Sequence, residues 1–234
     1  LLFLLFRCQE MQTKTSLTLL AVVVAAIAGT AFSREMTLGI DVAPGYPNQT
    51  VWDCLRTQGV EFVVVRCFRS TGVVDEWCTE NVQRAWKAGL KSVDLYFFPC
   101  VKCGNATGQM AQLKAHVDKD KLRFGRIFID VEMMKQYWLP DFEANKAFFS
   151  ELAATGVELF GDRIGVYTNK NGWTEIFGSE WTGGAHLPLW WAHWDKQGPS
   201  WDSWVPFAGW KTMVMKQYHG GTYVCDMHVD LDSY

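Results

Sequence analysis

Short apolar runs, bounded by glycine, proline or polar residues, recur along the chain. They are rich in β-branched and aromatic residues, which strands prefer. Between the first five runs, and just after the fifth, apolar residues are spaced three and four apart, as in amphipathic helices. We predict eight strands, at residues 37–43, 61–69, 92–99, 126–132, 163–169, 188–194, 213–220 and 228–234. The predicted helices are 50–58, 79–88, 107–117, 139–155 and 170–177, and Gly59, Gly89 and Gly156 mark helix ends.

The order of these elements is β–α five times, followed by three strands with little helix between them. Strands that alternate with helices favour parallel pairing, and eight strands suggest a closed barrel. The tryptophan-rich stretch from Trp181 to Trp210 takes the place of the later helices. We therefore predict an α/β barrel that lacks its last helices, with an open α/β sheet as the alternative. No internal repeat or interdomain linker is visible, so residues 34–234 are expected to form one domain.

Composition narrows the class of protein. The chain has 234 residues, of which 49% are hydrophobic and 15% aromatic, and this is enough for one sizeable core. Disordered chains are poor in such residues, so we exclude disorder. The net charge is -3 and there is no long basic run, which argues against a nucleic-acid partner.

The N-terminal segment has the three parts of a secretory signal. A lysine follows Met11, the apolar run 17–28 comes next, and small residues follow it. The apolar run is too short to span a bilayer comfortably. We assign residues 1–33 to a leader and signal peptide, cleaved after Ala31 or Ser33, with an uncleaved anchor as the alternative. The mature protein is then expected outside the cell, or in a lysosome or phagosome, with no stable membrane anchor.

Six of the seven cysteines lie beyond the predicted signal. An even number behind a signal peptide indicates three disulfides, and spacing alone does not choose the pairs. The C-x-x-C at residues 100–103 is also compatible with a redox pair or a metal site, but no thioredoxin-like context surrounds it. Acceptor sequences for N-glycosylation at Asn48 and Asn105 fit a secreted surface.

Acidic residues fall at the C-terminal ends of predicted strands, where α/β barrels carry their active sites. Asp41 ends the first strand, Asp130 and Glu132 end the fourth, and Asp230 lies in the last. A carboxylate in an apolar strand is costly unless it is paired, hydrogen-bonded or hydrated. Four such positions indicate a functional site. The alternative is that these acids cap loops or pair with nearby arginines.

Asp130 and Glu132 are two positions apart, so on a strand their side chains face the same way. A rise of ~3.3 Å per residue places their Cα atoms ~6.6 Å apart. Retaining and inverting glycosidases hold their carboxyls at separations on either side of this value, so the spacing does not assign the stereochemistry. Crowding raises the pKa of one carboxyl, as a general acid requires. Because the first and last strands of a closed barrel are neighbours, we expect Asp41 and Asp230 beside the pair.

Aromatic residues gather near the same strand ends. The apolar faces of sugar rings can lie on such rings, and the alternative is that they fill the core. Alternation along a strand sends Trp190 and Trp191 to opposite faces, so at most one of them lines a given groove. The sequence has no nucleophile elbow, phosphate-binding loop or H-E-x-x-H motif, and its histidines show no ligand spacing, so we expect no metal or cofactor.

Several of these segments together resemble the family 25 glycoside hydrolases, the Chalaropsis-type lysozymes. The resemblance is carried, in order, by LGIDVA, FIDVE, VYTN, PLWWAHWD, KQY and VDLD, and it covers residues 37–234. The segments YFFPCVKCGN and FGRIFIDVE look especially like eukaryotic, protist-type members. The resemblance implies an irregular TIM-like (β/α)5(β)3 barrel in a single domain. It also implies hydrolysis of the β-1,4 bond between N-acetylmuramic acid and N-acetylglucosamine in bacterial peptidoglycan, by a monomer without a cofactor.

Residue by residue, the resemblance implies that Glu132 is the general acid. Asp130 then assists the substrate N-acetyl group or stabilises the oxocarbenium-like charge, by a covalent or a neighbouring-group route. Asp41 and Asp230 match two further acids of the family. The residues that fall in motifs near its sugar groove are Tyr96, Tyr167, Trp190, Gln217 and Tyr218.

The chain departs from the bacterial members in two ways. Phe97 stands where they often have a histidine, which changes the sugar subsite beside the acids, and most of them lack the six cysteines. We expect the bridges Cys100–Cys103, Cys67–Cys78 and Cys54–Cys225.

Two functions compete with an active lysozyme. A catalytically inactive, glycan-binding relative is disfavoured because all four acids are intact. A chitin hydrolase is disfavoured because its longer acidic motif is absent. The slightly acidic net charge gives little steering towards anionic walls, and we expect a low working pH.

Overall fold

Strands and helices alternate in the computed structural model, which describes residues 36–43, 45, 47–132 and 134–234. The strands are β1 (Leu38–Val42), β2 (Phe62–Arg69), β3 (Val73–Val74), β4 (Ser92–Phe97), β5 (Ile127–Asp130), β6 (Ile164–Thr168), β7 (Leu189–Ala192), β8 (Met215–Val224) and β9 (Met227–Ser233). The helices are α2 (Gln49–Thr57), α3 (Cys78–Lys87), α4 (Ala106–Lys119), α5 (Met134–Tyr137), α6 (Phe142–Phe160) and α7 (Lys170–Phe177), with 3₁₀ turns η1 (Val101–Cys103) and η2 (Gly161–Arg163). The predicted signal peptide and its cleavage sites lie outside the described residues.

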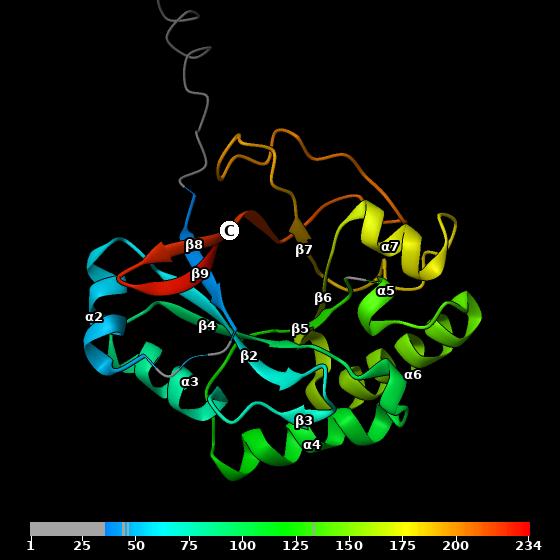
Figure 1. Cartoon of the computed structure of the whole chain (residues 1–234), viewed down its shortest axis with the longest axis horizontal. Coiled ribbons are helices and arrows are strands. Elements are labelled where there is room, and N and C mark those ends of the chain that lie inside the picture. Colours follow the sequence, from blue (N-terminus) through cyan, green and yellow to red (C-terminus); the bar gives the residue numbers. More distant parts are fainter. Residues whose placement is uncertain (1–35, 44, 46, 133) are drawn as a thin grey trace, which may run out of the picture. The chain divides into compact units, whose positions relative to one another are not determined.

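The sheet closes on itself (Figure 1). Its order is β1-β9-β8-β7-β6-β5-β4-β2, and a β1–β2 pairing completes the ring, while β3 adds a short antiparallel strand to β2. All neighbours in the ring are parallel except β9, which runs antiparallel to β1 and β8. The predicted (β/α)5(β)3 barrel is therefore confirmed, and the open sheet is wrong. Within the described part of the chain, no helix is long and apolar enough to cross a membrane.

The predicted C-terminal end of helix α6 is wrong. The sequence places its end at Gly156, but the helix continues to Phe160 and ends at Gly161, whose φ is +69°. A Cβ on Gly156 would lie 3.0 Å from Cδ1 of Ile164 and 3.3 Å from Cε of Met110. Glycine is therefore needed here for close packing of α6 on β6 and α4, rather than for a turn.

The C-terminal hairpin is longer than predicted. The sequence ends the seventh predicted strand at Gly220, but the pairing continues through shifts in register and β8 runs on to Val224. The turn lies instead at Cys225 and Asp226, both with positive φ.

Three disulfides hold the barrel, and all three are the expected pairs. Cys67–Cys78 joins β2 to α3, and Cys100–Cys103 closes the turn after β4. Cys54–Cys225 fastens the tip of the β8–β9 hairpin to α2. The two glycosylation candidates, Asn48 and Asn105, are exposed and precede α2 and α4.

Apolar side chains form two separate layers. The inner layer fills the barrel, and a much larger outer layer lies between the strands and the helices around them. Trp190 belongs to the inner layer and Trp191 to the outer one, as strand alternation predicts. The inner layer consists of Phe62, Val64, Tyr96, Phe128, Tyr167, Trp190 and Met215.

Candidate active site

A cavity of about 350 Å³ opens at the C-terminal ends of the barrel strands, and we call it the carboxylate compartment. All four predicted acids line it: Asp41 from β1, Asp130 from β5, Glu132 just after β5, and Asp230 from β9. Asp41 stands opposite Asp230 in the β1–β9 register, so closure of the barrel brings acids of the first and last strands to one site.

Four of the five predicted substrate-binding residues also line this compartment, namely Tyr96, Tyr167, Trp190 and Gln217. Tyr218 does not, nor does it line the neighbouring cavity described below. Its position explains why. Gln217 points into the barrel, and strand alternation turns the next residue away from it. Sequence reasoning placed both residues in the site because they share one motif.

A fifth carboxylate, Asp232, lies under the site and is fully buried. The indole Nε1 of Trp190 donates to its Oδ1 at 2.8 Å. Sequence reasoning missed it, although the VDLD motif contains it. The two-residue spacing from Asp230, which places both on one face of a strand, was the available signal.

The Gln217 amide links the first and last strands of the barrel within the site. Its Nε2 donates to Oδ2 of Asp41 at 2.7 Å and to Oδ2 of Asp230 at 3.3 Å. Its Oε1 accepts from the Tyr167 hydroxyl at 2.9 Å and from Nε1 of Trp194 at 3.0 Å. An indole N–H can only donate, so this contact fixes which amide atom is the oxygen.

Burial and crowding raise the pKa values of these carboxyls. Burial, and then the charge of Asp230, raise the pKa of Glu132 to about 7. The same two causes raise the pKa of Asp41 to about 8. The pKa of Asp130 also lies well above its usual value, because of burial and then the charge of Glu132. The compartment therefore retains protons near neutral pH, and Glu132 is able to donate one there.

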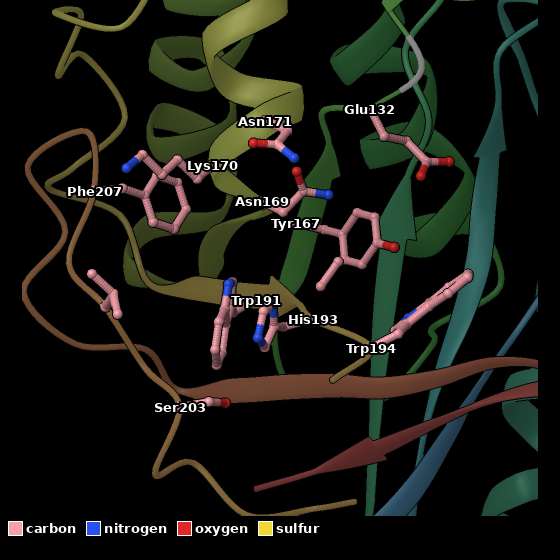
Figure 2. Close-up of a pocket in the computed structure, with 12 residues that line it drawn as sticks. Glu132, Tyr167, Asn169, Lys170, Asn171, Trp191, His193, Trp194, Ser203 and Phe207 are labelled. Carbon is pink, nitrogen blue, oxygen red and sulfur yellow. The ribbon is translucent and has the colours of Figure 1, made fainter. Parts of the chain in front are cut away.

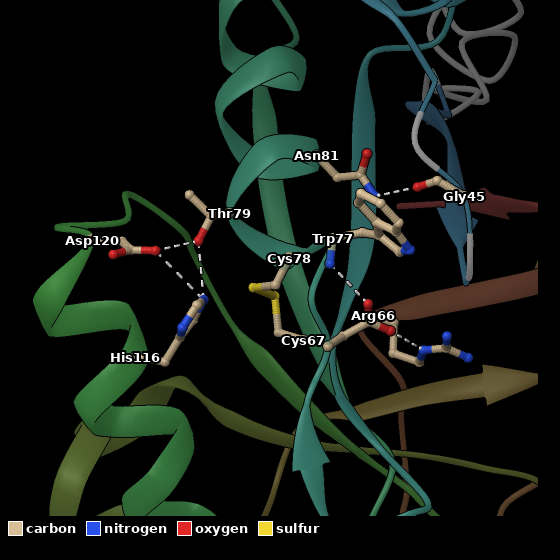
Figure 3. The surroundings of a disulfide bond; sticks show 10 residues. Gly45, Arg66, Cys67, Trp77, Cys78, Thr79, Asn81, His116 and Asp120 are labelled. Carbon is tan, nitrogen blue, oxygen red and sulfur yellow. Dashed lines mark hydrogen bonds and ion pairs between the residues drawn. A yellow bond between two sulfur atoms is a disulfide. The ribbon is translucent and has the colours of Figure 1, made fainter.

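Arg66 is the one arginine or lysine among the residues that line the carboxylate compartment. Its Nε donates to Oδ2 of buried Asp75 at 2.7 Å, beside the Cys67–Cys78 disulfide (Figure 3). Its charge lowers the pKa of Asp130, against the larger effect of burial. Oδ1 of Asp130 is buried and accepts no hydrogen bond from the described residues, while the residue itself lines the compartment.

A second cavity of about 500 Å³ adjoins the first, and we call it the aromatic compartment. Glu132, Tyr167 and Trp194 line both cavities. Trp194 is 60% exposed and stands between them. The two compartments therefore form one groove that passes the carboxyl of Glu132. Trp190 lines the carboxylate compartment and Trp191 the aromatic one, so the prediction that at most one of them lines a given groove holds for each compartment but is wrong for the groove as a whole. The other lining residues are Asn169, Lys170, Asn171, Trp191, Ala192, His193, Ser203, Val205 and Phe207 (Figure 2).

The described residues contain no group of three or more histidine, cysteine or acidic side chains arranged to hold a metal ion. Asp41 and Asp230 both accept from the Gln217 amide, and Asp232 accepts from Trp190. The raised pKa of Glu132 lets the groove supply a proton near neutral pH, and its aromatic rings offer faces on which a substrate can lie.

Several known proteins are similar to this chain in sequence. Residues 32–218 match the family model described as "Lysozyme-like protein 1". The chain is 37% identical to "Probable GH family 25 lysozyme 2" of Dictyostelium discoideum, over 84% of this chain and 90% of that protein. It is 31% identical to "Lysozyme-like protein 5" of Caenorhabditis elegans, over 83% and 89%. "Counting factor 50" of Dictyostelium discoideum is 31% identical, over 87% of this chain and 65% of that protein.

Solved structures share the fold. The family GH25 lysozyme from Aspergillus fumigatus superposes with a TM-score of 0.68 at 18% identity, covering 85% of this chain and 93% of that one. The autolysin LytC from Streptococcus pneumoniae, solved with a synthetic peptidoglycan ligand, gives a TM-score of 0.67 at 14% identity, covering 85% and 46%. With the family match over most of the described barrel, these likenesses show that the chain belongs to the family 25 glycoside hydrolases, the GH25 lysozymes.

Proposed function

We propose that the protein is a secreted muramidase. It hydrolyses the β-1,4 bond between N-acetylmuramic acid and N-acetylglucosamine in bacterial peptidoglycan, for defence against bacteria or their digestion. The observation that carries the proposal is the pairing of two carboxyls in a buried groove. Glu132 has a pKa of about 7, and Asp130 beside it has a buried oxygen without a partner among the described residues. Relatives named as lysozymes support the same reaction.

Glu132 acts as the general acid. Its raised pKa keeps the carboxyl protonated up to about neutral pH. The proton passes to the bridging oxygen as the bond from that oxygen to the anomeric carbon breaks, and positive charge develops on the sugar ring. The resulting Glu132 carboxylate then accepts a proton from the water that completes hydrolysis.

Asp130 acts on the developing charge. The Asp130 carboxylate lines the compartment, where it accepts the N–H of the 2-acetamido group and directs the acetamido oxygen at the anomeric carbon, or attacks that carbon itself. Both routes retain the anomeric configuration. Both also require the ionised form of Asp130. A proton on Glu132 removes the negative charge that raises the pKa of Asp130, and the charge of Arg66 lowers that pKa further, against the effect of burial.

Asp41, Asp230 and Gln217 hold the pair in place. Gln217 binds both acids through its Nε2. The charge of Asp230 helps to keep the pKa of Glu132 high, so this acid acts through the general acid rather than on the substrate.

The test is the conservative variant Glu132→Gln on a suspension of bacterial walls. We expect no clearing and an unchanged melting temperature, whereas Glu158→Gln, on the exposed face of α6, clears the walls like the wild type. Mass spectrometry of the wild-type digest should find N-acetylmuramic acid at the reducing ends. N-acetylglucosamine there would refute the proposed bond. Walls that are bound but never cut would identify an inactive, glycan-binding relative.

Secretion has its own test. The protein collected from the medium of a eukaryotic host should begin at Phe32 or Arg34. The side-chain oxygens of Asn48 and Asn105 cap helices, which leaves their nitrogens free to carry glycans. Deglycosylation should therefore lower the mass of the secreted chain. Retention of residues 1–33 on a membrane-bound product would contradict the proposed cleavage.

A further inference from the structure

Lys216 on β8 is fully buried, although it has no place in the chemistry proposed above. Its Nζ donates to Oδ1 and Oδ2 of Asp195, each at 3.2 Å. It also donates to the carbonyl oxygens of Gly198 at 3.2 Å and Ser200 at 2.8 Å. A buried ammonium is costly unless it is fully partnered. Here the hydrogen-bond acceptors just named all belong to one loop, and the centre of the Trp191 ring on β7 lies 5.6 Å from Nζ. The loop and the buried charge therefore hold each other in place.

The neighbouring strand fastens the same loop. Ser233 on β9 stands opposite Lys216 in the β8–β9 register and is also fully buried. Its hydroxyl donates to the Pro199 carbonyl at 3.0 Å and accepts from the indole of Trp201 at 3.2 Å. Two adjacent outward-facing positions thus form an anchor for the segment 195–201.

The inward-facing positions of the same strand pair belong to the catalytic groove. Gln217 follows Lys216 on β8, and Asp232 precedes Ser233 on β9. Gln217 and Asp232 stand opposite each other in the register. Trp194, which begins the anchored loop, donates its indole N–H to Gln217 at 3.0 Å. The loop is therefore held on the outer face of the strand pair through Lys216, and at the groove through Trp194.

We propose that Lys216 is a positioning residue for substrate specificity. It fixes the anchored loop so that Trp194 forms a rigid wall between the carboxylate and aromatic compartments. A glycan chain long enough to occupy both compartments is then aligned across Glu132, whereas a short saccharide that fills only the carboxylate compartment is not affected. The proposal rests on the proposed glycan hydrolysis and adds that polymeric chains are the substrate class that this groove selects.

The anchor itself is tested without any substrate. In Lys216→Met, amide hydrogen exchange over residues 195–201 should accelerate about tenfold or more, while exchange in β1–β6 stays unchanged. Lys211→Met changes an exposed lysine on the same β7–β8 connection and serves as the matched control. The double variant Asp195→Asn/Lys216→Met removes both charges and covers the case in which the single variant does not fold. Unchanged exchange in folded variants would refute the anchor, whatever the enzyme cleaves.

The role in specificity is tested by a double-mutant cycle on insoluble walls and on a short soluble saccharide. Lys216→Met and Trp194→Ala should each raise KM for walls about five- to tenfold. In Lys216→Met, kcat should stay within about twofold and cleavage of the short saccharide should not change, because this side chain lines neither compartment. The combined variant should be no worse than Trp194→Ala alone.

Two outcomes would overturn this role. One is a fall in the kcat of Lys216→Met in place of a rise in its KM. The other is an effect of Lys216→Met on KM that is as large in the Trp194→Ala background as in the wild type. If the wild type cuts neither substrate, the proposed function fails. The cycle is then run on wall binding in the Glu132→Gln background, which still decides the part played by Lys216.

Discussion

The first five β/α units and the last three strands of the same barrel cover their outer faces by different means. Apolar side chains of five helices pack against the first five barrel strands, which are β1, β2, β4, β5 and β6. The helices are α2, α3, α4, α6 and α7. Beyond β7, the long connection to β8 does this work with aromatic rings that pack edge-on or tilted, and it is held by the buried Lys216 of β8. It is drawn in orange in Figure 1.

The difference follows from how each kind of segment satisfies its backbone. A helix pairs its own N–H and C=O groups, so it needs only an apolar face to settle on a sheet. A loop leaves many of these groups without partners, so side chains must supply them, as Lys216 does for two carbonyls. The same loop supplies Trp194, Ser203 and Phe207 to the groove. The helical part of the barrel therefore carries most of the acids on a stable frame, whereas the loop-covered part adds an aromatic wall to the groove.

The largest expected effect lies at Asp130, which ends β5 in the helical part and lines the carboxylate compartment. Asp130→Asn keeps the shape of the side chain but removes the charge that stabilises the reacting sugar, so kcat should fall about 10²- to 10⁴-fold. The melting temperature should hold or rise, because a costly buried carboxyl is removed. Asp162→Asn, an exposed acid in η2, is the matched control. A loss of activity below tenfold would contradict the assigned role.

In the helical part, Leu152→Ala should cost about 2–5 kcal/mol of unfolding free energy, because it opens a cavity under α6. The KM and kcat of the folded enzyme should not change. Leu38→Ala, the same substitution at a side chain that is 41% exposed, should cost clearly less. Chemical denaturation and steady-state kinetics measure the two quantities. A raised KM for walls in Leu152→Ala would break the division between the stable frame and the groove wall.

The pH dependence sharpens the comparison within the groove. Glu132 must hold a proton to act, so activity should be present below pH 7 and fall as the pH rises through its pKa of about 7. Asp230→Asn removes a negative neighbour from the loop-covered part of the barrel, so this alkaline limb should move to lower pH. Asp226→Asn, at the exposed hairpin turn, should leave the limb in place. The measurement is the pH profile of kcat/KM, and a shift of the limb to higher pH would contradict the electrostatic argument.

The smallest effect is expected at Tyr218. This residue lines neither compartment, so Tyr218→Phe should change kcat/KM less than about twofold. Tyr167→Phe is the matched comparison. It removes the hydroxyl that binds Oε1 of Gln217 and should lower kcat/KM more. Equal losses in the two variants would restore Tyr218 to the groove.

Local patterns accounted for much of this molecule. Short apolar runs rich in β-branched and aromatic residues predicted the eight barrel strands, and carboxylates at strand ends predicted the place of the site. Asp41 and Asp230 could be paired from sequence because barrel closure joins the first strand to the last. Where the sequence failed, the structure depends on packing. Gly156 predicts a helix end, yet it serves close contact with Ile164.

The long connection after β7 was the least predictable region. Its conformation depends on partners more than ten positions away, such as Lys216 for Asp195, and no local period encodes such pairs. Trp194 enters the site only because that loop folds back over β8. Asp232 lies two positions from Asp230 on β9, so alternation along the strand predicts it on the same face. The rule that active-site acids lie at strand ends selected Asp230 alone.

The Cys54–Cys225 disulfide has a consequence for survival among proteases. It joins two residues 171 positions apart, so nearly the whole barrel lies within one covalent ring. A single cut inside that ring, for example in the exposed loop around Lys196, turns one chain into two but leaves the pieces bonded. Such a nicked enzyme keeps its strands at high mutual concentration and can close again after opening. An enzyme that works in a digestive fluid would outlast its own first cleavage.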